Sequence, residues 1–205
     1  MQINVKSALC GAYQENAYVV SVEGRDDCVV IDPGDDLEKL RRAVGDRKLA
    51  AILLTHGHFD HTLAAQPLAE ATGARLFIRR EDIEMLNDPA LNAYDPWSAK
   101  LPMPKGLAAE ALEGRASAAG LDFTVLHTPG HSRGSACFYL EEAGLLFSGD
   151  TLFEAGYGRM DLHGGSIRDM RQSLLTLFAL PGEVKVYPGH GGVTTIARER
   201  ERYHL

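Results

Sequence analysis

The sequence THGHFDH at residues 55–61 decides how this 205-residue chain is interpreted, because it places four potential metal ligands within six positions. In an extended loop the side chains alternate, so His56 and His58 point to the same side and can bind one metal ion. We expect the chain to turn into a helix directly after this stretch, which directs Asp60 and His61 at a second metal ion close by. Neutral imidazoles and a carboxylate suit zinc, iron or manganese.

Outward from this stretch, five apolar runs each end in a turn that carries a potential metal ligand or a residue able to support one. These residues are Asp32, His56, His131, Asp150 and His190. Strand ends that face the same edge of a sheet bring distant residues together, and α/β folds bind ligands at such edges. We therefore expect His131 to complete the first metal site and His190 the second, with Asp150 bridging the two metal ions. A glycine precedes each of these last three residues and allows a tight turn.

The other histidines are interpreted as structural residues, because a single histidine near a strand end usually makes an ordinary hydrogen bond. They are His127, His163 and His204. Cys137 lies in a strand pattern with no neighbour that would lower its pKa, so we expect it in the core rather than at a reactive site.

The composition excludes several classes of protein. The formal net charge of -7 argues against nucleic acid as a partner, since phosphate binding needs a basic surface. The sequence has no signal-peptide pattern, and no apolar run approaches the roughly 18 residues of a membrane span. Three cysteines without metal-like spacing favour a reducing compartment. We therefore expect a cytoplasmic protein, with no membrane partner, that is a monomer or a small homo-oligomer.

Hydrophobic periodicity predicts a mixed α/β chain. The predicted strands span residues 3–9, 17–22, 28–31, 49–54, 75–78, 123–126, 136–140, 145–147 and 184–187. The predicted helices span residues 37–44, 62–72, 81–86 and 167–177. Residues 87–106 contain four prolines and are expected to form a long loop, which in a compact domain is usually functional or mobile.

Four motifs, THGHFDH, TPGHSRG, SGDTLF and YPGHGG, resemble the successive motifs of the metallo-β-lactamase superfamily, whose fold is a four-layered αβ/βα sandwich. The similarity extends from QENAYVV and VVIDPG near the start to GHGGVTTI near the end. After the expected bridging aspartate, GYGRMDLHGGS resembles the glyoxalase II-like branch, which comprises the hydroxyacylglutathione hydrolases and their short bacterial relatives.

The resemblance implies two divalent metal ions per chain, zinc in the first place, with iron or manganese as alternatives. One ion would be bound by His56, His58 and His131, and the other by Asp60, His61 and His190, with Asp150 as the bridge. Full-length glyoxalase II enzymes have a C-terminal helical domain whose basic residues help to hold glutathione. Only about fifteen residues follow His190, so we expect residues 1–205 to form a single metallo-β-lactamase-like domain without that helical domain.

The expected activity is hydrolysis of a small thioester, an S-acyl conjugate such as S-lactoylglutathione, by a metal-bridging hydroxide. Asp60 and Asp150 are the expected catalytic residues. A thiolate is a good leaving group because a thiol has a pKa of about 8.5, and we identify no spare general acid for an amine. The alternatives are a persulfide dioxygenase with one iron ion, a lactone or ester hydrolase of the same superfamily, and a non-catalytic metal-binding protein.

Four further residues are candidates for supporting roles. Asp32 either hydrogen-bonds a liganding imidazole or only forms the Asp-Pro-Gly turn. Arg159 is expected to pair with Asp161 and support the loop after the bridging aspartate; alternatively, it contacts an acidic group of the substrate. Tyr157 and the loop that carries Tyr94 and Trp97 either form part of the pocket wall or, as is more common for aromatic residues in loops, cover the core.

Overall fold

The computed structural model describes residues 2–203 and contains two six-stranded sheets. The first sheet has the order β1 (Ile3–Cys10), β2 (Glu15–Val22), β3 (Asp27–Ile31), β4 (Lys48–Leu53), β5 (Arg75–Ile78) and β6 (Glu110–Ala111). The second has the order β12 (Thr194–Thr195), β11 (Lys185–Pro188), β10 (Leu145–Gly149), β9 (Ala136–Leu140), β8 (Leu121–His127) and β7 (Arg115–Ala118).

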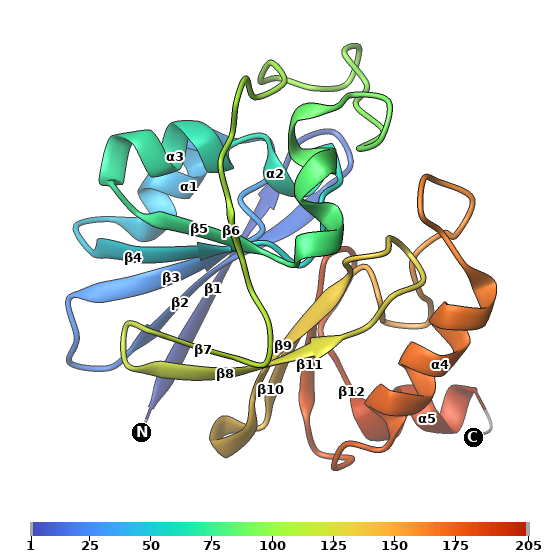
Figure 1. Cartoon of the computed structure of the whole chain (residues 1–205). Helices are drawn as coiled ribbons and strands as arrows, with labels where there is room; N and C mark the ends of the chain where they lie inside the picture. Colours follow the sequence, from blue (N-terminus) through green and yellow to red (C-terminus); the bar gives the residue numbers. More distant parts are fainter. Residues whose placement is uncertain (1, 204–205) are drawn as a thin grey trace.

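Helices cover the outer face of each sheet (Figure 1). On the first sheet these are α1 (Leu37–Val44) and α3 (Ala65–Thr72), and on the second α4 (Ile167–Phe178) and α5 (Ile196–Arg202). The layers are therefore helix, sheet, sheet and helix, which confirms the predicted four-layered sandwich. Among residues 2–203, no helix combines the length and the apolar character needed to cross a membrane.

Strands such as β2, β3 and β9 are almost continuously apolar, because successive side chains point to opposite faces of the sheet and both faces are buried there. In β2, Ala17 and Val19 pack under the helices of the first sheet, whereas Tyr18 and Val20 face the second sheet. The space between the sheets is filled from both sides by large side chains such as Phe123 of β8. Burial of one such side chain stabilises the fold by about 1.5–3 kcal/mol.

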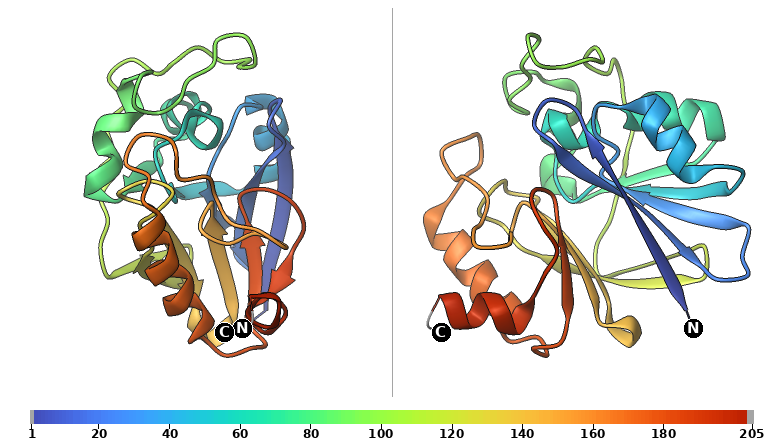
Figure 2. Two further views of the ribbon diagram at one scale, coloured as in Figure 1. Left: turned by 90° about the vertical axis from the view of Figure 1, so that its right-hand side faces the viewer. Right: turned by 180° about the vertical axis from the view of Figure 1, so that it is seen from behind.

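The predicted strand ends do meet at one edge. Strands β3 and β4 are parallel, and so are β10 and β11. Strand β8 is antiparallel to β9, as is β10, so β8 and β10 run in the same direction. Within each sheet, the segments that follow these strands therefore leave at one end, and the contact between His61, after β4, and Asp150, after β10, brings the two ends together. The irregular loop of residues 88–109 lies at this end as well, at the top of both views in Figure 2.

The prediction of one helix over residues 62–72 is wrong. The structure has a single turn, α2 (Phe59–Thr62), that begins inside the histidine-rich stretch, and α3 then starts at Ala65. The amide of Ala64 donates to the carbonyls of Pro33 and Gly34 rather than to its own helix, and Pro67 has no N–H to donate to the carbonyl of Leu63, so the hydrogen-bond ladder is interrupted between α2 and α3. The predicted helix at 81–86 is a 3₁₀ helix, η1 (Arg80–Asn87), and a second short one is η2 (Glu141–Ala143).

Candidate metal centre

The histidine-rich stretch follows β4, and its backbone changes direction at α2. His58 is the N-cap of α2 and has extended backbone, whereas Asp60 and His61 lie within the helical turn. This geometry separates the four side chains into two directions. Gly57 allows η1 to pack closely against the histidine-rich stretch, because a Cβ atom at this position would lie 2.7 Å from the Cβ of Met85.

Two clusters of ligand atoms result from this arrangement. In the first, nitrogen atoms of His56, His58 and His131 lie within 4.8 Å of one another. The Nδ1 of His58 lies 2.8 Å from the Nε2 of His131. In the second cluster, ligand atoms of Asp60, His61 and His190 lie within the same distance of one another.

Asp150 lies between the two clusters. Its Oδ1 is 3.3 Å from the Nε2 of His61, and its Oδ2 is 3.5 Å from the Nε2 of His131. The same Oδ2 lies 3.7 Å from the Nε2 of His190. The backbone reaches this position through Gly149, whose φ of +48° is the left-handed conformation that glycine adopts without strain. One carboxylate thus faces ligands of both clusters.

In four of the five histidines Nδ1 contacts an oxygen atom of the protein, so Nε2 is the nitrogen that faces the other ligands. The Nδ1 of His131 is 2.7 Å from the carbonyl oxygen of Arg159, and that of His190 is 3.1 Å from the carbonyl oxygen of Tyr13. A carbonyl only accepts, so these nitrogens carry the proton and each Nε2 has a free lone pair. In a metal site, such partners set the tautomer and the orientation of the ring.

Asp32 and Thr55 supply the remaining two partners. The Oδ2 of Asp32 lies 3.1 Å from the Nδ1 of His61 and accepts the Thr55 hydroxyl at 2.6 Å. The same hydroxyl oxygen lies 3.0 Å from the Nδ1 of His56 and accepts its proton. Asp32, which has a φ of +49°, also accepts the Thr55 amide. It forms a third ligand-like group with His56 and His61. However, these contacts occupy its oxygens, so the geometry makes it a support for the two histidines.

The electrostatics favour the protonation states that bind metal at three of the ligands, His56, His58 and Asp150. Burial, reinforced by the other histidines, lowers the pKa of His56 well below its usual range and that of His58 to about 3, so both rings are neutral at pH 7. Burial alone would raise the pKa of Asp150, but the nearby His61 holds it well below its ordinary value. Neutral imidazoles and an ionised carboxylate are the ligand forms that divalent metals require. His61 is the exception: burial would lower its pKa, but Asp150 and Asp60 raise it well above its usual range, so this ring must lose a proton to bind metal.

Several buried polar atoms of the site have no hydrogen-bond partner within the described part of the chain and are available to bind a metal ion. Among the buried side-chain atoms of residues 2–203, five have no hydrogen-bond partner: the Nε2 atoms of His56 and His58, Oδ1 of Asp150 and both carboxylate oxygens of Glu15. Buried polar atoms are costly when they are left unpaired. Three of the five belong to expected metal ligands, and Glu15 lies beside His61. The nitrogen and oxygen donors fit divalent metal ions at both positions.

Three residues that support the ligand loops were missed from the sequence. Asp82 of η1 accepts hydrogen bonds from Gly57 N, Ser132 Oγ and Gly134 N at 3.1, 2.6 and 2.6 Å, and so ties the loop of His56 and His58 to that of His131. No local pattern marks it.

The other two supports, Glu15 and Asn16, are the first two residues of β2 and are buried; two polar residues at the head of an apolar run were the available signal. Asn16 donates to the carbonyls of Pro188 and Gly191, which flank His190. Glu15 is fully buried 3.9 Å from the Nδ1 of His61, and burial raises its pKa well above the usual range.

A cavity of about 440 Å³ opens onto both clusters. Besides metal-site residues, its lining consists of Tyr13, Phe59, Ala93, Phe153, Gly158, Arg159 and Leu162. The expected ion pair is present, because the guanidinium of Arg159 donates to both oxygens of Asp161 at 2.7 and 2.6 Å.

Tyr157 does not line the cavity. A short antiparallel bridge between Phe153 and Gly156 reverses the chain, and Phe153 lines the cavity instead. The ring of Tyr157 lies against that of Tyr203, 5.9 Å between centroids, in a separate groove beside α4. Trp97 is 95% exposed and also lies outside the lining.

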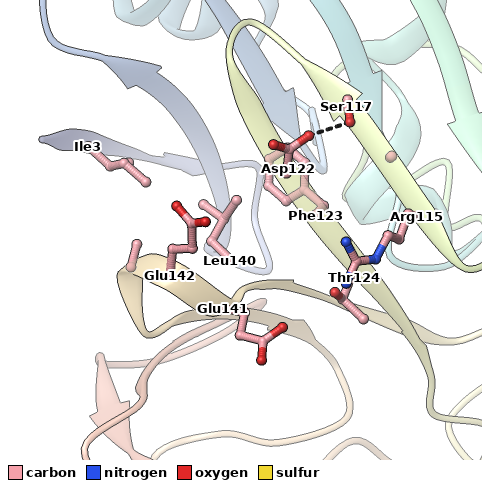
Figure 3. A pocket seen from close by; sticks show the side chains of 11 residues that line it. Ile3, Arg115, Ser117, Asp122, Phe123, Thr124, Leu140, Glu141 and Glu142 are labelled. Carbon is pink, nitrogen blue, oxygen red and sulfur yellow. Dashed lines mark hydrogen bonds between the residues drawn. The ribbon is translucent and has the colours of Figure 1, made fainter. Parts of the chain in front are cut away.

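The remaining histidines have ordinary surroundings where they are described. His127 contacts the carbonyl of Arg133, and His163 lies 4.0 Å from Glu84. His204 lies outside the described residues. Another cavity, of about 530 Å³, lies where the β7–β8 hairpin and η2 approach the start of β1 (Figure 3). Its side chains include Arg115, Asp122 and Glu141, without any histidine, so it lacks the ligands of a metal centre of this kind.

A family model described as the Metallo-beta-lactamase superfamily matches residues 10–190. The chain belongs to this superfamily. The superfamily motifs and the observed layers therefore agree, and the resemblance identified from the motifs is confirmed.

Three similar proteins match nearly the whole chain. The hydroxyacylglutathione hydrolase GloC of Haemophilus influenzae is 29% identical over 214 residues, covering 97% of this chain and 95% of that protein. Among solved structures, the BLEG-1 B3 metallo-beta-lactamase has a TM-score of 0.90 and 34% identity, with 97% of each chain covered. TTHA1623 in a di-iron-bound form has a TM-score of 0.82 and 41% identity, with 95% of this chain and 96% of that chain covered.

Proposed function

We propose that this protein is a binuclear metallohydrolase that cleaves a small thioester, such as S-lactoylglutathione. The observation that carries the proposal is the position of Asp150, whose two oxygens face the Nε2 atoms of His61 and His131 in separate ligand clusters. A carboxylate between two such clusters is suited to bridge two metal ions. Bound there, the two ions would lower the pKa of a water molecule and polarise the carbonyl group of the substrate.

The side chains have distinct roles in this proposal. His56, His58 and His131 hold one metal ion, and Asp60, His61 and His190 hold the other, with Asp150 shared. Zinc is the first choice for both positions; the di-iron form of TTHA1623 supports iron as the alternative. Asp60, whose pKa is held below its usual value by His61 and His190 despite its burial, stays ionised to hold the second ion.

The relatives support a thioester as the substrate. The Haemophilus influenzae hydroxyacylglutathione hydrolase is matched over nearly its whole length, so a protein of that name has little sequence beyond the matched region. In the reaction, water adds to the carbonyl carbon, the C–S bond breaks, and a carboxylic acid and a thiol are released. None of the cavity-lining residues is a free general acid, which favours a leaving group that departs without protonation.

The test is the hydrolysis of S-D-lactoylglutathione by protein loaded with zinc or iron, together with the metal content per chain. We expect turnover that a chelator abolishes, and two metal ions per chain. His58→Ala and Asp150→Ala should lose metal and activity while retaining the circular dichroism of the parent, whereas His163→Ala serves as the matched control. Full metal content with near-normal turnover in the first two variants would refute the assignment. One iron per chain with persulfide-dependent oxygen uptake would instead identify a dioxygenase.

A second candidate is β-lactam hydrolysis, which the similarity to the BLEG-1 B3 metallo-beta-lactamase favours. This reaction cleaves an amide, whose nitrogen must be protonated on departure. A chromogenic cephalosporin assayed with the same metal-loaded protein separates the two candidates. Turnover of the cephalosporin at a kcat/KM above that of the thioester would favour the lactamase.

A further inference from the structure

The wall of the metal-site cavity is largely apolar. Beside the metal ligands it presents the rings of Tyr13, Phe59 and Phe153 and the aliphatic side chain of Leu162. The ring of Phe59 stands edge-on to that of Tyr13, with centroids 5.5 Å apart, and the ring of Phe153 stands edge-on to that of His190 at 5.9 Å. Edge-to-face packing of this kind holds aromatic side chains in defined positions.

The polar groups of the wall are already engaged with protein partners. The guanidinium of Arg159 is held by both oxygens of Asp161. The hydroxyl of Tyr13 donates to Asp95 at 3.4 Å, and its backbone carbonyl accepts a hydrogen bond from the Nδ1 of His190. The wall therefore offers mainly aromatic and aliphatic surface, and two of the five N–H groups of its arginine, Arg159, are already engaged by Asp161.

We propose that the acyl group of the substrate is a bulky apolar or aromatic one, bound against Tyr13, Phe59, Phe153 and Leu162, rather than a short hydroxyacyl group. This inference rests on the proposed thioester hydrolysis and specifies its substrate class. A cavity of about 440 Å³ leaves a lactoyl group, which has only one methyl substituent, mostly surrounded by water. A phenyl ring in place of that methyl removes much more apolar surface from water when it packs against the wall.

The experiment compares two substrates that share one thiol. S-D-lactoylglutathione and S-D-mandeloylglutathione differ only in a methyl or a phenyl group on the same carbon, and hydrolysis releases lactate or mandelate together with glutathione. We expect kcat/KM to be about tenfold higher for the mandeloyl substrate, the lower end of what one small apolar group contributes in a protein pocket. The ratio of the two values is independent of the fraction of protein that is loaded with metal.

Variants locate the preference in the wall. Leu162→Ala and Phe153→Ala should each lower the mandeloyl-to-lactoyl ratio at least threefold. Leu162→Ala leaves the ring contact between Phe153 and the metal ligand His190 intact, so its effect comes from the wall alone. Tyr157→Ala is the matched control, because it removes an aromatic ring four positions away whose side chain lies in another groove, and it should leave the ratio unchanged.

A binding measurement separates this inference from the proposed function. We expect S-benzylglutathione to bind about tenfold more tightly than S-methylglutathione by calorimetry, with the difference reduced in Leu162→Ala. If neither thioester is hydrolysed, the proposed function fails, and the binding ratio still decides whether the wall selects apolar groups. If the two thioesters are hydrolysed with equal kcat/KM, or if the two thioethers bind equally, the inference is overturned while thioester hydrolysis stands.

Discussion

Replacement of Asp82 by asparagine tests whether one buried carboxylate joins the two loops that carry the first ligand cluster. Asp82 is fully buried, and its three donors lie 25, 50 and 52 positions away in the sequence. Asparagine has nearly the same shape but keeps only one acceptor oxygen. In one orientation the oxygen faces Gly134 N and the new NH₂ group faces Gly57 N. In the flipped orientation the NH₂ group faces Gly134 N.

The magnitude follows from these two orientations. In either one, a buried backbone N–H loses its acceptor, which costs about 1–3 kcal/mol. The remaining hydrogen bonds also lose the strength that the negative charge gives them. We therefore expect Asp82→Asn to lower the free energy of unfolding by about 2–4 kcal/mol, a large part of the stability of a typical domain.

The assay is urea unfolding of metal-free protein at pH 7, which isolates the effect on the fold, followed by metal titration. Because Asp82 positions the loops of His58 and His131, we expect an affinity for the first metal ion that is about 10–100-fold lower. Glu84→Gln is the matched control on the same η1 turn; the side chain of Glu84 is exposed, and its loss should change stability by less than about 0.5 kcal/mol. A change as small as this in Asp82→Asn would refute the reasoning.

Three other predictions concern the second metal ion, metal removal and the cysteines. Asn16→Asp loses the two amide protons that hold the carbonyls on either side of His190, so affinity for the second ion should fall about 10–100-fold in a metal titration. Equal affinity in both proteins would exclude this role. Chelation should lower the melting temperature by about 5–10 °C, since an ion present at 100 times its Kd adds about 2.7 kcal/mol; an unchanged value would mean that the clusters hold no metal. Burial raises the pKa of Cys10 to about 12 and those of Cys28 and Cys137 to about 11, so at pH 8 roughly one thiol in a thousand or fewer is ionised. Ellman's reagent should label none of them in native protein and all three in urea; rapid labelling of the native protein would contradict this burial.

Local patterns in the sequence were sufficient to predict most of the fold. Apolar runs predicted the main strands because each sheet is buried on both faces, and alternation then assigns successive side chains to opposite faces. The long loop of residues 87–106 was predicted from its prolines, and the structure has no helix or strand over residues 88–109. Short edge strands such as β7 (Arg115–Ala118) were missed, because an alternation of only four residues, with alanine as its apolar member, is too short and too weakly apolar to indicate a strand. The final helix α5 was also missed, because its sequence is dominated by charges.

The sequence by itself determined which residues are candidate ligands, because the five strands preceding them could be identified from apolar runs and their ends expected at one edge. Only the tertiary structure decided what supports those ligands. Asp82 contacts loops that are 25 to 52 positions away, and Asn16 reaches carbonyls 172 and 175 positions away. It also decided that Phe153 rather than Tyr157 lines the cavity. The physical reason is that periodicity records whether a side chain is buried, whereas its partners depend on how distant segments pack.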